Sequence, residues 1–252
     1  MSCFGENEAL LLTEKLLFGY SLKGRKKSFA DAFDFVLNAD EVVALMGENG
    51  CGKSTLLKTL SGMIAPLDGN VILDGRPLLD WASRERARRV ALVRMGLALP
   101  SRMSVREFVN LGRSPYSAML DSRSAEDVRI VDEAMELLDV SQFAERLVSE
   151  LSDGERSRVY LACAMAQQVK VLLLDEPNAF LDIPRSHALF RTLRKVAAER
   201  RIGIIVSTHS MEYAQKYCDR IMVIDKRTVR VAPATEALAM GLLDWTQLGM
   251  NP

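Results

Sequence analysis

Residues 47–55 constrain this chain most, because they match a pattern that few other loops share. They read Gly-Glu-Asn-Gly-Cys-Gly-Lys-Ser-Thr and fit the phosphate-binding pattern G-x-x-x-x-G-K-[ST]. The apolar run at 42–46 predicts a buried strand just before the loop, and residues 56–60 predict a helix after it. A chance glycine-rich loop is the alternative. The strand before and the helix after favour a phosphate site.

The residue types of this loop explain how it would hold a polyphosphate. Glycines let the backbone turn tightly and bring its N–H groups close to the phosphates, and the helix start adds further unpaired donors. Lys53 can reach the β- and γ-phosphates, and the Ser54 hydroxyl can ligate Mg²⁺. The expected nucleotide-binding residues here are Gly47, Asn49, Gly50, Cys51, Gly52, Lys53, Ser54 and Thr55.

Composition bounds the class of protein. The 252 residues are 48% hydrophobic, enough for one large domain with a sizeable core. Lys+Arg and Asp+Glu are both 33, so the net charge is zero, which argues against a dedicated nucleic-acid binder. A basic stretch at 84–89 is a candidate nucleic-acid patch, but a solvated helix face is the favoured interpretation.

The sequence shows no apolar run of membrane-spanning length and no signal-peptide pattern at its start. We therefore expect a cytosolic product. The four cysteines, Cys3, Cys51, Cys163 and Cys218, are scattered without metal-site or disulfide spacing.

Hydrophobic patterning predicts an α/β fold. Residues 15–37 suggest two short strands joined by a basic turn at 23–27, the second strand running through Phe29, Phe33 and Phe35. A helical pattern fills 104–147, and buried strands at 171–174, 202–206 and 221–224 alternate with helices. Such alternation implies a mostly parallel sheet. The last twenty residues suggest a peripheral helical tail.

Two acids follow the apolar strand at 171–174. Asp175 at the strand end can hold Mg²⁺ directly or through water, and Glu176 can orient and deprotonate a water aimed at the γ-phosphate. Two solvated acids at a strand end are the alternative. The upstream phosphate loop favours the catalytic interpretation.

With these motifs, the chain resembles the ATPase subunit of ABC (ATP-binding cassette) transporters over almost its whole length. Leu-Ser-Asp-Gly-Glu at 151–155 is similar to the family signature, residues 179–182 to its D-loop, and residues 207–210 to the strand end that carries the switch histidine. Tyr20 lies where the family has an aromatic residue that stacks on adenine. Each motif alone is weak, but their order along the chain matches the family.

The resemblance implies a role for each matching residue. Ser152 and the N–H of Gly154 would close over the γ-phosphate of ATP bound to a second copy, so two ATPs would be buried in a head-to-tail homodimer. His209 would contact that phosphate and hold Glu176 or the water, and Asp182 would belong to the nucleotide site. A strand-end tyrosine that packs locally is the alternative for Tyr20.

The implied fold is a P-loop NTPase core with a mostly parallel sheet, an N-terminal antiparallel β region and an inserted helical subdomain. We expect one ABC ATPase domain over 1–252. Its α/β core would comprise 1–95 and 151–232, with the helical subdomain at about 96–150 and the tail at 233–252.

Three positions depart from the family pattern. Met95 stands where the family has a glutamine that bridges Mg²⁺, water and the membrane subunit, and a thioether is a poor Mg²⁺ ligand. Asp153 replaces the first glycine of the signature, and Ser157 replaces a common glutamine. We therefore expect hydrolysis with an atypical rate or coupling.

Residues 104–109, 111–116 and 180–184 are similar to bacterial importers of iron–siderophore complexes, haem and vitamin B12. The implied partners are a second ATPase subunit, integral-membrane permease subunits facing 84–116, and indirectly an extracytoplasmic substrate-binding protein, but no nucleic acid. The implied location is the cytoplasmic face of a bacterial membrane.

Other classes remain open. A regulatory or weakly hydrolysing nucleotide-binding subunit would fit Met95 and Asp153, although Glu176 and His209 speak against it. A soluble ABC ATPase acting on DNA or ribosomes would call for a coiled-coil insertion or tandem cassettes. A P-loop kinase would lack the signature helix.

Overall fold

A computed structural model describes residues 8–22, 25–94, 102–116 and 124–242 of the chain. Its centre is a six-stranded sheet in the order β12-β11-β5-β10-β9-β8. All neighbouring strands run parallel except β12, which pairs antiparallel with β11. These strands are β5 (Val42–Gly47), β8 (Val90–Arg94), β9 (Val171–Asp175), β10 (Gly203–Ser207), β11 (Arg220–Asp225) and β12 (Thr228–Pro233). The predicted mostly parallel sheet is confirmed.

The central strands are continuous apolar runs because both faces of the sheet are covered. Along β5, Val43 and Leu45 enter one hydrophobic core while Ala44 and Met46 enter the other. The first core lies between the two sheets and includes the apolar face of α1 (Lys53–Leu60). The second lies beneath the helices of the opposite face.

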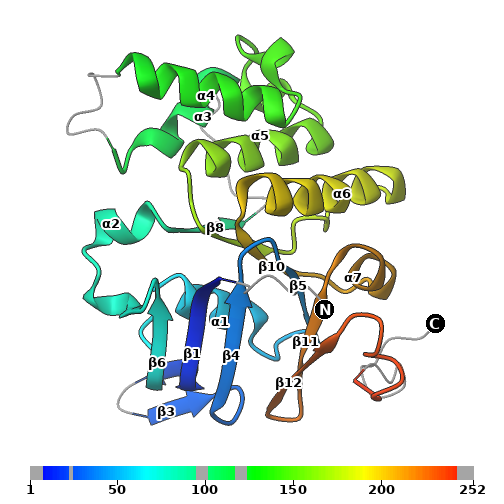
Figure 1. The fold of residues 1–252 in the computed structure, drawn as a ribbon. Helices are drawn as coiled ribbons and strands as arrows, with labels where there is room; N and C mark the ends of the chain where they lie inside the picture. Colours follow the sequence, from blue (N-terminus) through cyan, green and yellow to red (C-terminus); the bar gives the residue numbers. More distant parts are fainter. Residues whose placement is uncertain (1–7, 23–24, 95–101, 117–123, 243–252) are drawn as a thin grey trace, which may run out of the picture.

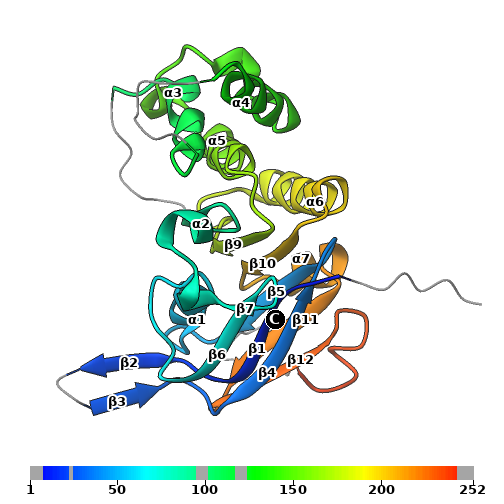
Figure 2. The ribbon, with the colours of Figure 1, turned by 60° about the vertical axis from the view of Figure 1, so that its left-hand side comes forward.

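An antiparallel sheet covers the first core, in the order β4-β1-β6-β7. Its strands are β1 (Ala9–Leu17), β4 (Phe33–Asn38), β6 (Asp68–Leu73) and β7 (Arg76–Pro77). A separate hairpin of β2 (Gly19–Leu22) and β3 (Arg25–Ser28) projects from the body of the molecule (Figure 2). The N-terminal antiparallel region is thus confirmed.

The detail of this region differs from the sequence prediction of two strands over 15–37. Four strands lie between residues 9 and 38, and Phe29 falls in the connection between β3 and β4 rather than in a strand. A bulge explains why β1 was missed. Lys15 has φ 46, and the exposed pair Glu14 and Lys15 interrupts the alternation of buried and exposed residues.

Helices α3 and α4 form a separate layer on top of α5, away from the two sheets (Figure 1). These helices are α3 (Val105–Asn110), α4 (Ala125–Leu137) and α5 (Asp153–Ala166). Ser104 and Ser124 each form a capping box with the acid three residues on, as their sequence pattern predicts. Short 3-10 turns complete this part of the chain at η2 (Leu111–Arg113), η3 (Ser141–Phe143) and η4 (Val148–Glu150).

The remaining helices are η1 (Leu78–Asp80), α2 (Ser83–Ala87), α6 (Ile183–Arg200) and α7 (Met211–Tyr217). The predicted helical tail is not found in its described part, because residues 234–242 form turns. Residues 243–252 lie outside the described residues. Of the helices in the described ranges, none combines the length and apolar character that crossing a membrane requires.

Candidate active site

The phosphate-binding loop joins β5 to α1 and has positive φ angles at its glycines. Gly52 caps α1 with φ 105, and a Cβ placed there would lie 2.5 Å from the Phe29 ring. Gly47 has φ 147, and a Cβ there would lie 2.6 Å from the carbonyl oxygen of Ile224. Only glycine fits these two positions. Among the described residues, no side chain caps α1, and no acid lies in its first turn, so its N-terminal N–H groups are available to an anion.

Lys53 is buried beneath this loop. Its Nζ donates hydrogen bonds to the carbonyl oxygens of Gly47 at 2.8 Å and Glu48 at 3.2 Å. The ammonium group therefore lies inside the curve of the loop, where a bound polyphosphate would meet it. Asn49 and Gly50 are exposed at the tip, and burial raises the pKa of the half-buried Cys51 thiol, which favours its neutral form.

Asp175 ends β9 beside the start of α1. Ser54 Oγ donates to Asp175 Oδ1 at 3.0 Å, and Ser207 Oγ, from β10, donates to the same oxygen at 3.3 Å. Hydroxyl and carboxylate oxygens are the donors that Mg²⁺ prefers. Among the described residues, no cluster of three or more His, Cys, Asp or Glu side chains could bind a metal alone. Ser54 and Asp175 therefore fit an ion that takes its other ligands from nucleotide and water.

Glu176 and His209 meet at the carboxyl ends of adjacent parallel strands. His209 Nε2 lies 3.1 Å from Glu176 Oε1. The Glu176 backbone is left-handed, with φ 49, and its N–H donates to Ser207 Oγ at 2.7 Å. Such a φ is unfavourable for a residue other than glycine, so the surrounding bonds must hold it. Both side chains are partly exposed and can reach a water molecule.

Tyr20 lies beside the phosphate loop rather than apart from it. Its hydroxyl and the Thr55 hydroxyl are 2.5 Å apart, and its ring meets Phe29 edge-on at 5.5 Å between centroids. Phe29 also packs under Gly52. The tyrosine ring is half-exposed, which leaves room for a base to stack.

Ser152, Gly154 and Asp182 form a second group. Ser152 caps α5 in a capping box with Glu155, and Asp182 caps α6 by accepting from Arg185 N at 2.8 Å. The Arg185 side chain lies over the Cα of Gly154. Among the described residues, none of their hydrogen bonds or ion pairs reaches the phosphate loop, Asp175, Glu176 or His209.

The structure adds residues that the sequence alone did not single out. Ser207 links Asp175 to Glu176, and Arg94 lies 3.5 Å from the second oxygen of Asp175. The contacts of Ser207 and of Arg94 with these acids depend on which strands are neighbours in the sheet, and a local sequence motif does not predict that. Met95 lies outside the described residues. The Asp153 carboxylate, which departs from the signature, pairs with Arg156 at 3.4 Å.

Comparison with known proteins identifies this arrangement. The family model for ABC transporters matches residues 30–179, more than half of the chain. The chain belongs to the ABC transporter family. It is the ATP-binding subunit of such a transporter, and therefore an ATPase.

Relatives in this family are similar over most of the chain. The hemin import ATP-binding protein of Streptomyces coelicolor is 39% identical over 216 residues, 84% of this chain and 75% of that protein. The ferric enterobactin transport ATP-binding protein of Escherichia coli is 33% identical over 219 residues, 87% of this chain and 79% of that protein. A solved structure described as a metal-chelate type ABC transporter in an inward-facing conformation aligns with a TM-score of 0.82 at 25% identity. It covers 96% of this chain and 89% of that chain.

Proposed function

We propose that this ATPase energises import of a metal chelate, namely an iron–siderophore complex, haem or cobalamin. The observation that carries the catalytic part is the continuous set of contacts from Ser54 through Asp175, Ser207 and Glu176 to His209. The similarity to hemin and ferric enterobactin import proteins supports the cargo class.

In this proposal the chain's own residues divide the work. The loop amides and Lys53 bind the phosphates, while Ser54 and Asp175 hold Mg²⁺, which would neutralise phosphate charge. Glu176 accepts a proton from the attacking water, and His209 fixes the Glu176 carboxylate or that water. Ser207 supports both acids because its hydroxyl bonds the backbone of one and the side chain of the other.

We further propose that one chain holds only part of each site. Among the described residues, no hydrogen bond joins Ser152 or Gly154 to the phosphate loop, so we infer that they serve the ATP of a second copy in a head-to-tail dimer. Phe180 and Ile183, beside Asp182, are exposed by 66% and 67%, as an uncovered interface would be. Arg156 offsets the charge of Asp153 near the phosphate that this helix would face.

The permease would contact a groove of ≈ 390 Å³ between α2, β8 and α5. Its lining residues include Met63, Arg86, Leu92, Arg94, Tyr160 and Gln167. Arg94, at the end of β8, lines this groove and pairs with Asp175, so an occupant at that end would lie near the site. In the proposed importer, the ATPase lies at the cytoplasmic face of the membrane. An extracytoplasmic substrate-binding protein would deliver the cargo to the permease.

The decisive experiment is phosphate release from the purified chain with Mg-ATP, beside Glu176→Gln. We expect turnover in the wild type. The variant should not turn over, but should form a dimer that ATP stabilises. Tight ATP binding without turnover, even with the permease present, would instead support a regulatory subunit.

The cargo is tested separately in cells that lack this gene. Uptake of radiolabelled haem, of a ferric siderophore and of cobalamin is measured in these cells after the wild-type gene or the Glu176→Gln gene has been restored. Restoration of one uptake by the wild type alone identifies the cargo, and restoration of none rejects this cargo class.

A further inference from the structure

Arg94 ends β8 directly beside the candidate Mg²⁺ ligand. In the parallel ladder between β8 and β9, Arg94 pairs with Asp175. Its Nε lies 3.5 Å from Asp175 Oδ2. The Asp175 side chain is only 8% exposed, whereas that of Arg94 is 46% exposed. The backbone register therefore fixes a cation next to a buried carboxylate.

The two oxygens of Asp175 have different partners. Oδ1 accepts from the hydroxyls of Ser54 and Ser207, and Oδ2 faces Arg94. Lys53, the cation of the phosphate loop, donates instead to the carbonyl oxygens of Gly47 and Glu48. Because a buried carboxylate without a counter-charge is costly, Arg94 supplies the charge that balances Asp175.

A metal ion at Ser54 and Asp175 would meet this guanidinium at close range. Two cations that share one carboxylate repel each other, so a metal ion on the Oδ1 side would weaken the hold of Arg94 on Oδ2. Its side chain has somewhere to go, because it is half-exposed and also lines the groove between α2, β8 and α5.

We propose that Arg94 is a displaceable counterion of the metal site. It holds Asp175 before the metal arrives and raises the Mg²⁺ concentration at which the site loads. This inference rests on the proposed function, specifically on the assignment of Mg²⁺ to Ser54 and Asp175. Arg94 is thus a positioning residue whose effect is on metal affinity rather than on the chemical step.

The test measures metal binding without turnover. A fluorescent ADP is titrated onto the protein in EDTA and again in saturating Mg²⁺. The dissociation constant in EDTA divided by that in Mg²⁺ reports how strongly the site binds the ion, because a larger value means that Mg²⁺ strengthens ADP binding more. The variants are Arg94→Gln, Arg94→Lys and Asp175→Asn. Arg191→Gln, which removes the same charge from an exposed position on α6, is the control.

In Arg94→Gln the ratio should rise about fivefold, the size expected when a half-exposed ion pair no longer competes. Arg94→Lys and Arg191→Gln should keep the wild-type ratio. Asp175→Asn should lower it. An unchanged or lower ratio in Arg94→Gln, with Asp175→Asn still impaired, overturns the role of Arg94 alone. An unchanged ratio in Asp175→Asn overturns the metal assignment itself. Folding of each variant is checked by its affinity for ADP in EDTA.

Discussion

At the scale of single residues, an uncharged serine at the end of β10 links the two acids of the site. The Ser207 hydroxyl accepts from the Glu176 N–H at 2.7 Å and donates to Asp175 Oδ1 at 3.3 Å. It therefore stabilises the left-handed backbone of Glu176, which has φ 49, and aligns the two acids with each other.

We expect Ser207→Ala to lower ATP turnover about tenfold, because Glu176 loses the bond that fixes its backbone and small misplacements are costly in catalysis. ATP affinity should change little, since the phosphate loop is untouched. The matched control is Ser210→Ala, which removes a hydroxyl that caps α7 three residues after Ser207. Steady-state phosphate release gives kcat and KM for each variant. Equal losses in the two variants would contradict a specific role for Ser207.

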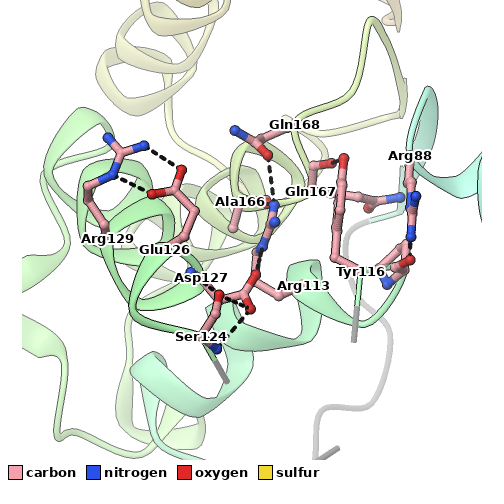
Figure 3. A network of polar contacts seen from close by, with 11 residues as sticks. Arg88, Arg113, Tyr116, Ser124, Glu126, Asp127, Arg129, Ala166, Gln167 and Gln168 are labelled. Carbon is pink, nitrogen blue, oxygen red and sulfur yellow. Dashed lines mark hydrogen bonds and ion pairs between the residues drawn. The ribbon is translucent and has the colours of Figure 1, made fainter. Parts of the chain in front are cut away.

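At the scale of elements, a buried ion pair fastens α4 to the end of α5. Arg113, in η2, donates from Nε to Asp127 Oδ1 at 2.8 Å and from Nη1 to the carbonyl oxygen of Ala166 at 2.7 Å (Figure 3). Its guanidinium also stacks on Tyr116, 3.8 Å from the ring centroid. Both partners of the ion pair are buried. The hydrogen bond from Arg113 holds the pKa of Asp127 below its usual range.

Asp127→Asn should lower the free energy of unfolding at pH 7 by about 3 kcal/mol, because it leaves a buried guanidinium without its counter-charge. The pH dependence follows from the lowered pKa. The unfolded carboxyl keeps the higher pKa, so the stabilisation is fully present above that value, near pH 4, and is lost as the pH falls through the folded pKa. The difference between variant and wild type should therefore narrow below pH 4.

Urea unfolding at several pH values measures this difference. Glu126→Gln is the control, because it changes the neighbouring acid of the same helix turn, whose partner Arg129 is exposed (Figure 3). It should have little effect on stability. A loss in Asp127→Asn that is as large at pH 3 as at pH 7 would contradict the ion-pair explanation.

Elements with strong local signals could be predicted from the sequence, and those that depend on distant neighbours could not. The run before Gly47 and the run before Asp175 are long, apolar and flanked by motifs, so β5 and β9 were predicted. β1 was missed because its bulge at Lys15 breaks the pattern. Arg94 carries no motif. Its place beside Asp175 follows only from the pairing of β8 with β9.

At the scale of the whole molecule, the separation of the two groups of predicted site residues is the feature to explain. The loop that begins α1 carries Lys53, and the start of α5 carries Gly154. A head-to-tail dimer would bring the α5 start of one copy to the α1 start of the other. Each complete site would then combine one intact phosphate loop with one intact signature from different chains.

This geometry predicts complementation between two inactive variants. Lys53→Ala disables the phosphate loop, and Gly154→Asp places a carboxylate at the α5 start, where it would repel phosphate. Each variant alone should be inactive. In a mixture, the loop of the Gly154→Asp chain meets the intact signature of the Lys53→Ala chain, so ATP turnover should rise above that of either variant. A dimer of two Gly154→Asp chains cannot form such a site, because neither chain has an intact signature.

The control is Ala198→Asp, which adds the same charge at an exposed position of α6 and should leave turnover unchanged. Gly154→Asp should still bind ATP, because its own loop is intact and the atoms nearest to an added Cβ belong to the flexible side chain of Arg185. If the mixture is no more active than its components, while Gly154→Asp binds ATP and pairs with Lys53→Ala, the sites are not shared head to tail. Recovery would instead establish that each ATP is hydrolysed between two copies, which one folded chain cannot achieve alone.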